Sequence, residues 1–199
     1  MNKVGVVLFD GCWGSQLMTI LDFMAIYQGL AHKKSLTTNI DYQFYALEKT
    51  SVILANGLTI DTQPLTANCA DDLLVIVGIE YRHLQQLLNS GQLKNSVLAT
   101  VLRHSKRVLT LSTASFLIAE LKLWPTEHLV THWQFEQFFR TRYPDYLLKS
   151  QCELVDNGQF CSSVGLSGAL YCLSQYLLRF GEKSIVEHCL AIMSKNLDS

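Results

Sequence analysis

Apolar residues recur along the chain in two patterns, one typical of buried strands and one typical of helices. Short apolar runs predict strands at residues 3–9, 40–48, 72–78 and 108–111. Apolar positions at helical spacing predict helices at residues 15–30, 84–102, 116–123, 135–143, 165–180 and 183–193. Because strands alternate with helices, the pattern predicts a mostly parallel sheet covered on both faces.

Turn residues refine these elements. Asn56-Gly57 lies between two short β-favouring runs and predicts a small β-hairpin, and Asp156-Asn-Gly158 predicts a second hairpin. Ser90-Gly91 predicts a break within the helix at residues 84–102. Tyr143-Pro144 predicts the end of the helix at 135–143, and Gly181 predicts the end of the helix at 165–180. Ser15 is a plausible cap for the first helix.

The composition indicates one soluble domain that covers residues 1–199. Of the 199 residues, 49% are hydrophobic and 17% are charged, as in a globule with a full core. No apolar run reaches the roughly 18 residues that a membrane span requires. Residues 1–9 lead into a strand rather than a secretory signal, so we expect a cytoplasmic protein without a membrane partner.

Charge and cysteine usage exclude other classes. The net charge of −1, without a basic stripe, argues against direct DNA binding by this chain, since phosphate neutralisation needs clustered Lys and Arg. The six cysteines form no Cys-x-x-Cys pair and no Cys/His cluster at zinc spacing. We therefore expect reduced thiols, no metal and no cofactor.

Candidate chemistry gathers where the predicted strand at 108–111 meets its helix at Ser112. Gln16, Gly78, Ser112 and His132 follow different strands and could converge at the carboxyl edge of the sheet, where ligands bind in open α/β folds. Ser112 and His132 could be a nucleophile and its base. Because the glycines of a G-x-S-x-G elbow are missing, Ser112 is more commonly a helix cap, and His132 is more commonly a structural histidine.

Two neighbouring residues add alternatives. Trp13, on the loop before the first helix, could line a pocket, but it could equally be a packing or dimer contact. Cys12 could be a redox-sensing thiol, which would require an exposed thiolate of low pKa.

Several short segments together resemble a known superfamily over nearly the whole chain. They are residues 6–11, 56–60, 72–78, the Ser112 junction, Thr131-His-Trp133 with Tyr143-Pro144, residues 155–158 and residues 163–165. The chain resembles the class I glutamine amidotransferase-like, PfpI-type superfamily, and more closely the N-terminal sensor domain of AraC-type transcriptional regulators. Thr-His-Trp, the following Tyr-Pro and the Asp-x-Gly hairpin are the most specific of these features.

The resemblance implies a three-layer flavodoxin-like sandwich with a small β-hairpin. It also implies a reactive cysteine at the strand-to-helix elbow, an acidic residue after the first strand and a histidine. The cysteine falls on Ser112, the acid on Gln16 and the histidine on His132, so only the histidine is present. A serine hydroxyl keeps its proton without an effective base, and the amide of Gln16 does not titrate. The chain therefore lacks both the thiolate nucleophile and the carboxylate that would adjust the pKa of that nucleophile.

We therefore predict a non-catalytic ligand-sensing and dimerisation domain of an AraC-type regulator. Its ligand-binding residues would be Trp13, Gln16, Gly78, Ser112, Thr113 and His132. The expected partners are a small-molecule effector, a second copy in a homodimer, and DNA only through a separate helix-turn-helix region that is not in this chain. The alternative is a small-molecule hydrolase, lyase or amidase of the same superfamily that uses Ser112 and His132.

Overall fold

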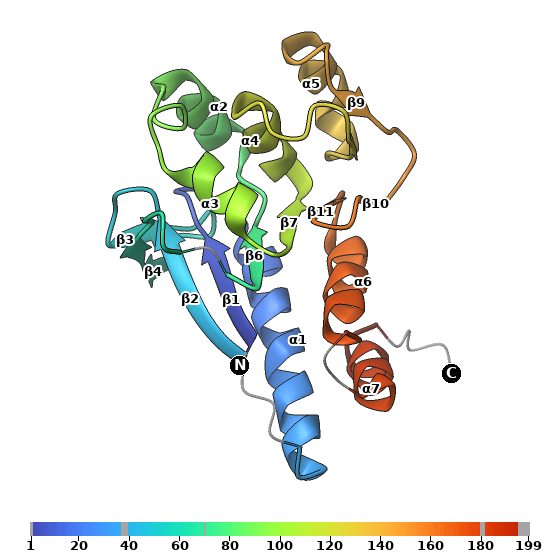
Figure 1. Ribbon diagram of the computed structural model, residues 1–199. Helices are drawn as coiled ribbons and strands as arrows, with labels where there is room; N and C mark the ends of the chain where they lie inside the picture. Colours follow the sequence, from blue (N-terminus) through green and yellow to red (C-terminus); the bar gives the residue numbers. More distant parts are fainter. Residues whose placement is uncertain (1, 37–39, 70, 180–181, 195–199) are drawn as a thin grey trace.

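A seven-stranded sheet forms the centre of the protein. The computed structural model describes residues 2–36, 40–69, 71–179 and 182–194 (Figure 1). The strands of the sheet are β1 (Asn2–Val7), β2 (Ile40–Ala46), β5 (Gln63–Pro64), β6 (Leu73–Ile76), β7 (Val108–Leu111), β10 (Leu154–Asp156) and β11 (Phe160–Ser163). Their order is β10-β11-β7-β6-β1-β2-β5, and every neighbouring pair is parallel except β10 with β11.

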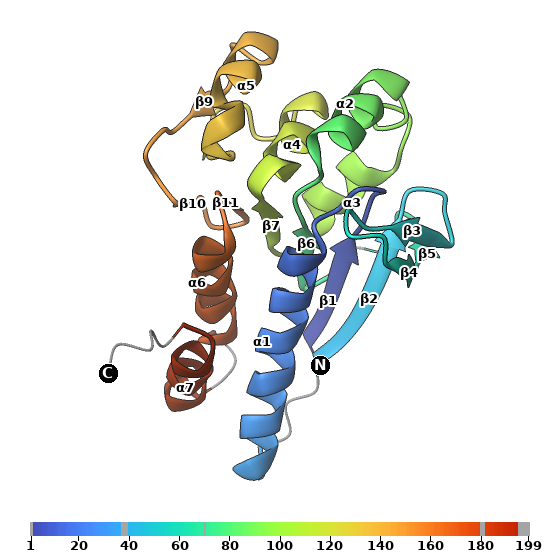
Figure 2. The same cartoon turned by 180° about the vertical axis from the view of Figure 1, so that it is seen from behind.

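Helices cover the sheet on both faces. They are α1 (Gly14–Lys33), α2 (Tyr81–Ser90), α3 (Leu98–His104), α4 (Ser115–Glu120), α5 (Glu136–Arg142), α6 (Leu166–Leu177) and α7 (Lys183–Ser194). Helices α1, α6 and α7 contact one another and form one layer (Figures 1 and 2). The connections from β1 to β2 and from β6 to β7 run in opposite directions along the sheet, so right-handed crossovers place α1 opposite α2 and α3. The predicted three-layer α/β sandwich is confirmed.

Two small sheets lie outside the central one. β3 (Ser51–Ile53) and β4 (Thr59–Asp61) form the predicted hairpin around Asn56-Gly57, with Gly57 at a φ of 84° that suits glycine. β8 (His128–Leu129) pairs in parallel with β9 (Leu147–Leu148). The second predicted hairpin is also confirmed, and as β10–β11 it extends the edge of the central sheet.

Some predicted boundaries differ from the structure. The break within residues 84–102 is confirmed, because Gly91 ends α2 with a φ of 75°. Ser15 as a helix cap is wrong, because Trp13 is the capping residue of α1 and makes no side-chain cap bond. Helix α6 ends at Leu177, and the predicted stop at Gly181 lies outside the described residues. The short edge strand β5 carries no apolar pattern, so the sequence gives no sign of it.

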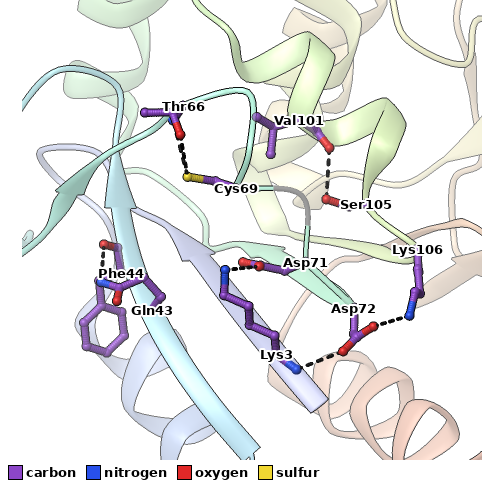
Figure 3. Close-up of polar contacts among 10 residues, drawn as sticks. All are labelled: Lys3, Gln43, Phe44, Thr66, Cys69, Asp71, Asp72, Val101, Ser105 and Lys106. Atoms are coloured by element: carbon purple, nitrogen blue, oxygen red, sulfur yellow. Dashed lines mark hydrogen bonds and ion pairs between the residues drawn. The ribbon is translucent and has the colours of Figure 1, made fainter. Parts of the chain in front are cut away.

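The amino-terminal edge of the sheet holds a buried carboxylate (Figure 3). Asp71 has a fully buried side chain, and its Oδ1 lies 2.9 Å from Lys3 Nζ. Gly5 leaves the room that this carboxylate needs, since a Cβ there would lie 2.2 Å from Asp71 Oδ2. The ion pair with Asp71 and a hydrogen bond with Tyr45 raise the pKa of Lys3 above its usual range. This polar edge lies at the opposite ends of the strands from the candidate site.

Candidate functional site

The direction of winding changes between β1 and β6. The chain passes from β1 outward to β2, and from β6 outward to β7 on the other side. Backbone hydrogen bonds join the two turns that follow these strands, from Trp13 N to Gly78 O at 2.9 Å and from Glu80 N to Gly11 O at 2.8 Å. Ligands of open α/β sheets bind at such a switch point, beyond the carboxyl ends of the strands. Trp13 and Gly78 therefore lie at the switch point of the sheet.

Ser112 lies at the end of β7 in a left-handed backbone conformation. Its φ is 54°, which is uncommon for a residue other than glycine. Ser112 is buried, with only 5% of its surface exposed. The chain then forms a short 3-10 helix, η1 (Ser112–Ala114), before α4. Such strain persists only where surrounding structure enforces it, and it is common at functional sites. The junction thus has the strained geometry of a nucleophile elbow, although the glycines of the G-x-S-x-G motif are missing.

Gln16 and Gly78 meet Ser112 as predicted. Gln16 Oε1 accepts a hydrogen bond from Gly78 N at 2.7 Å in a buried environment. A Cβ on Gly78 would lie 2.9 Å from Ser112 Cβ and 3.0 Å from Gln16 Oε1. Position 78 therefore requires glycine, because a larger side chain would clash with both Ser112 and Gln16.

Thr113 holds the same two loops together. Its Oγ1 donates to Ile79 O at 2.7 Å and accepts from Ile79 N at 2.8 Å, both in the buried interior. Both functions of the hydroxyl are engaged, so Thr113 fixes the loop after β6 rather than offering a free group. Thr131 Oγ1 in turn donates to Ser112 O at 3.3 Å and brings the segment before His132 to the junction. Thr131 belongs to the Thr-His-Trp segment, but this contact of its side chain was not predicted from the sequence.

His132 is half-buried beside this junction and is held by its own turn. Its Nδ1 accepts a hydrogen bond from Gln134 N at 3.3 Å, and its ring lies against Trp133 and Phe135 with centroids 5.4 and 5.7 Å away. An Nδ1 that accepts a hydrogen bond from a backbone N–H carries no proton itself, so in the neutral ring the proton is on Nε2. The free nitrogen of His132 is thus a donor.

The Ser112 hydroxyl makes no hydrogen bond to any of the described residues. It does not cap the following helix, since η1 and α4 have no side-chain cap bond, and the cap interpretation is wrong. The left-handed φ explains this, because a capping residue has an extended backbone that directs its side chain back to the helix. The hydroxyl is left available to a ligand.

Replacing Ser112 by glycine should stabilise the protein. Relief of the left-handed strain outweighs the added flexibility of the unfolded chain, so relative to Ser112→Ala we expect a gain of about 0.5–1 kcal/mol in the free energy of unfolding. Ser112→Ala is the matched reference because it removes the same hydroxyl and keeps the strain. Chemical denaturation of both variants measures the difference. A glycine variant less stable than the alanine variant would contradict the strained geometry.

Helix α4 and helix α5 are joined by rings and by one buried carboxylate. Phe116 contacts Phe138, Phe139 and Tyr143 with ring centroids 4.9–6.0 Å apart. Glu120, whose side chain is 8% exposed, accepts from Tyr143 at 2.7 Å and from Arg142 at 3.2 Å. These contacts fix the two ends of the segment that carries His132.

Glu120 should make stability depend on acid pH. Burial alone would raise its pKa, but hydrogen bonds from Tyr143, Arg142 and Lys94 lower it below the usual value. Because the folded pKa is lowered, the stabilisation is complete above the unfolded pKa of about 4.3 and is lost as the pH falls through the folded pKa. Glu120→Gln should cost about 2 kcal/mol at neutral pH.

Urea unfolding at neutral pH and at about pH 3.5 tests this, because the gap between the parent and Glu120→Gln should shrink in acid. Glu127→Gln is the control, since the Glu127 side chain forms no hydrogen bond or ion pair with any of the described residues. A gap of equal size at both pH values would exclude the proposed role of Glu120.

Trp13 lies at an exposed apolar surface. It is 41% exposed, and Ile53 and Leu58 of the β3–β4 hairpin are also exposed. The hairpin is bound to the loop before α1, since Gly11 N donates to Ile53 O and Ala55 N donates to Cys12 O. We call Trp13, Ile53 and Leu58 the hairpin patch.

The cysteines differ from the expectation in two ways. Cys12 is fully buried and accepts from Phe9 N, and burial raises its pKa to about 12, so the redox interpretation, which needs an exposed thiolate of low pKa, is wrong. The expectation of reduced thiols is wrong for one pair, because Cys161 and Cys172 form a disulfide. Helix α6 turns back onto β11 and brings these two residues together. Cys12, Cys69, Cys152 and Cys189 are free.

The described ranges contain neither a candidate metal site nor a membrane-spanning helix. Within them, no group of three or more His, Cys, Asp or Glu side chains could hold a metal ion. Nor is any helix in the same ranges long and apolar enough to cross a bilayer.

Comparison with known proteins identifies the fold. No family model and no curated protein sequence matches the chain. An AraC family transcriptional regulator from Pseudomonas putida is 15% identical with a TM-score of 0.72, and the match covers 98% of this chain and 100% of that one. A putative transcriptional regulator from Vibrio parahaemolyticus is 14% identical with a TM-score of 0.79, covering 97% and 99%.

A THiJ/PfpI family protein from Pseudomonas syringae is 11% identical with a TM-score of 0.76, and the match covers 100% of this chain and 76% of that one. Identities this low establish a common fold and leave activity open. The resemblance to the PfpI-type superfamily and to AraC-type sensor domains is thus confirmed at the level of the fold.

Proposed function

We propose that the chain is a ligand-sensing and dimerising domain of a cytoplasmic AraC-type transcriptional regulator, in which the Ser112 junction binds a small molecule without transforming it. The observation that supports this most is the hydrogen bond from Gln134 N to His132 Nδ1. It holds the ring proton on Nε2, whereas a base for Ser112 must present an unprotonated nitrogen. The pair therefore lacks the proton acceptor that a serine nucleophile needs.

Gln16 supports the same conclusion from the other side of the junction. A neutral amide cannot tune the charge of a nucleophile, and its Oε1 already accepts from Gly78 N. That backbone N–H is consequently occupied and is not free to stabilise an oxyanion. Both groups that would assist turnover are used to hold the loops in place.

The free groups at the junction suit a ligand that accepts hydrogen bonds. The Ser112 hydroxyl has no partner among the described side chains, and His132 Nε2–H is the available donor of its ring. Two donors beside a strained turn favour a small molecule with oxygen or nitrogen acceptors. DNA binding would belong to a separate helix-turn-helix region.

The hairpin patch is the proposed dimer surface. Trp13, Ile53 and Leu58 expose apolar area that a second copy could bury. Trp13→Asp should therefore shift the protein toward monomer in sedimentation experiments, while Trp133→Asp, a change at the 72% exposed Trp133, should leave the assembly unchanged. A monomeric parent, or two variants that behave alike, would exclude this patch.

A thermal-shift screen of small metabolites tests the sensing role. We expect at least one stabiliser whose effect is lost in Ser112→Trp, because an indole at this position would cover the place where the proposed ligand meets the junction. Ser112→Ala is the matched control: it removes only the hydroxyl, so the effect should be weakened by about the value of one hydrogen bond and not abolished. A stabiliser that acts equally on Ser112→Trp would bind elsewhere, and a screen without any stabiliser would contradict sensing at this junction.

The rival function is that of a small-molecule hydrolase, lyase or amidase that uses Ser112 and His132. One observation favours it, namely the left-handed φ of 54° at Ser112, which is typical of strained nucleophile turns. It would require His132 to change tautomer by breaking its bond with Gln134 N. The rival therefore predicts a covalent adduct on Ser112, which the sensing role excludes.

A further inference from the structure

A cavity of about 490 Å³ lies apart from the Ser112 junction. It is bounded by the carboxyl ends of β1 and β2, the loop from β2 to β3, helix α2 and the chain from Ser90 to Val97. None of the six predicted ligand-binding residues lines it. Its volume is that of small-molecule sites, which are commonly about 300–1,000 Å³.

The floor of the cavity is apolar and comes from the core. Leu8, Phe9, Ala46, Val52 and Leu65 line it and are buried, and Leu87 of α2 is half-buried. Strands that end side by side at this edge hold these side chains in place. A ligand that fills the cavity would thus bury an apolar body against them.

Three ionisable side chains on the rim, those of Asp10, Lys49 and His83, already have partners within the protein. Lys49 Nζ pairs with Asp10 Oδ2, and Ile53 N donates to Asp10 Oδ1 at 3.0 Å. His83 Nδ1 lies 2.9 Å from Glu80 Oε2. These contacts engage Lys49, both oxygens of Asp10 and one ring nitrogen of His83.

Four other polar side chains on the rim have no polar partner. Glu48, Gln86, Gln92 and Asn95 line the cavity, and their side chains form no hydrogen bond or ion pair within the described part of the chain. Glu48 is thus the charge of the rim that has no counterion, and the amide oxygens of Gln86 and Asn95 can accept hydrogen bonds. An anion entering here would meet an unpaired carboxylate, whereas a cation would neutralise it.

We propose that this cavity is a second ligand site, which binds a small organic cation: an apolar body that lies on the floor and carries an amine toward Glu48. The site does not depend on the proposed function of the Ser112 junction. The β2–β3 loop supplies Glu48 and Lys49 and leads into the β3–β4 hairpin. A bound ligand would therefore contact the loop that leads into the hairpin.

Tryptamine and indole-3-propionate test the proposal, because they share an indole body and carry opposite charges. Amide chemical shifts of the isotope-labelled protein locate binding, and their titration gives the affinity. We expect tryptamine to shift the amides of Leu65, Leu87 and Val97 in a saturable way, with at least about fivefold tighter binding than the anion. Glu48→Gln should bring the two affinities within about twofold of one another.

Two further variants complete the design. Val97→Trp, at an exposed position on the rim, should block both compounds while the rest of the spectrum shows an intact fold. Glu153→Gln is the matched control, because Glu153 is exposed and distant from the cavity lining. Equal affinities of the two compounds for the parent, or no saturable shift with tryptamine, would overturn the proposal. Shifts confined to Ser112 and Thr113 would also overturn it and would leave the function proposed for the junction intact.

Discussion

Replacing Phe116 by alanine should lower the free energy of unfolding by about 4 kcal/mol, the largest effect expected from a single change near the site. Phe116 is fully buried in α4, and its ring contacts Phe138, Phe139 and Tyr143. The change removes the apolar contacts and leaves a cavity between two helices that cannot collapse freely. Denaturant unfolding followed by circular dichroism measures the loss.

The effect should also reach His132. Helix α5 follows the His132 segment directly, so a loosened contact with α4 should speed amide exchange between Thr131 and Phe139 more than in the central strands. Phe116→Leu is the matched control, because it keeps most of the volume and should cost about 1–1.5 kcal/mol. A loss below about 1.5 kcal/mol in Phe116→Ala would show that α4 and α5 are not held together by this ring.

Replacing Lys3 by methionine should cost about 2–3 kcal/mol, because it leaves the buried carboxylate of Asp71 without a counterion. The value lies at the low end for buried pairs, since the Lys3 side chain is 44% exposed and water can reach it. The ion pair raises the pKa of Lys3, so its contribution is complete below the unfolded pKa of about 10.4 and is lost only as the pH rises through the folded pKa. The cost of Lys3→Met should therefore be constant from neutral pH to about pH 9.5.

A double variant separates this charge effect from simple loss of packing. Adding Asp71→Asn to Lys3→Met removes the unpaired charge and should recover about half of the loss, while Lys3→Arg should stay close to the parent. Equilibrium unfolding of the parent, Lys3→Met, Asp71→Asn and the double variant gives the coupling free energy directly. If the double variant is no more stable than Lys3→Met, the carboxylate is not the cause.

The fold could be predicted because its elements are long and their patterns agree. The apolar runs that became β1, β6 and β7 are buried on both faces, which is typical of a parallel sheet. Asn56-Gly57 and Asp156-Asn-Gly158 fixed the two hairpins by their turn chemistry. The two-residue strand β5 escaped because Gln63 and Pro64 are exposed and need no apolar side chain.

The convergence of Gln16, Gly78 and Ser112 could be predicted, but their hydrogen bonds could not. Convergence follows from strand order, since the carboxyl ends of neighbouring parallel strands share one edge of the sheet. The left-handed φ of Ser112 has no signature in a sequence that places serine rather than glycine there. The bond from Gly78 N to Gln16 Oε1 depends on atomic distances between two loops.

The cavity escaped prediction for a related reason. Its rim comes from Asp10, Glu48 and the chain near Asn95, which are far apart in sequence and individually resemble ordinary surface positions. Asp10 closes the turn after β1, and that position at the sheet edge was the one available sign. Only the folded structure brings the β2–β3 loop, α2 and residues 90–97 around one cavity and places an unpaired carboxylate beside an apolar floor.

Intact-protein mass spectrometry after incubation with a serine-directed fluorophosphonate tests the central claim most directly, since it asks whether Ser112 can act as a nucleophile. With Nε2 of His132 protonated and Gln16 bound to Gly78, we predict an unchanged mass, while a serine hydrolase in the same tube is fully labelled. A stoichiometric adduct that maps to Ser112 and disappears in Ser112→Ala would contradict the account.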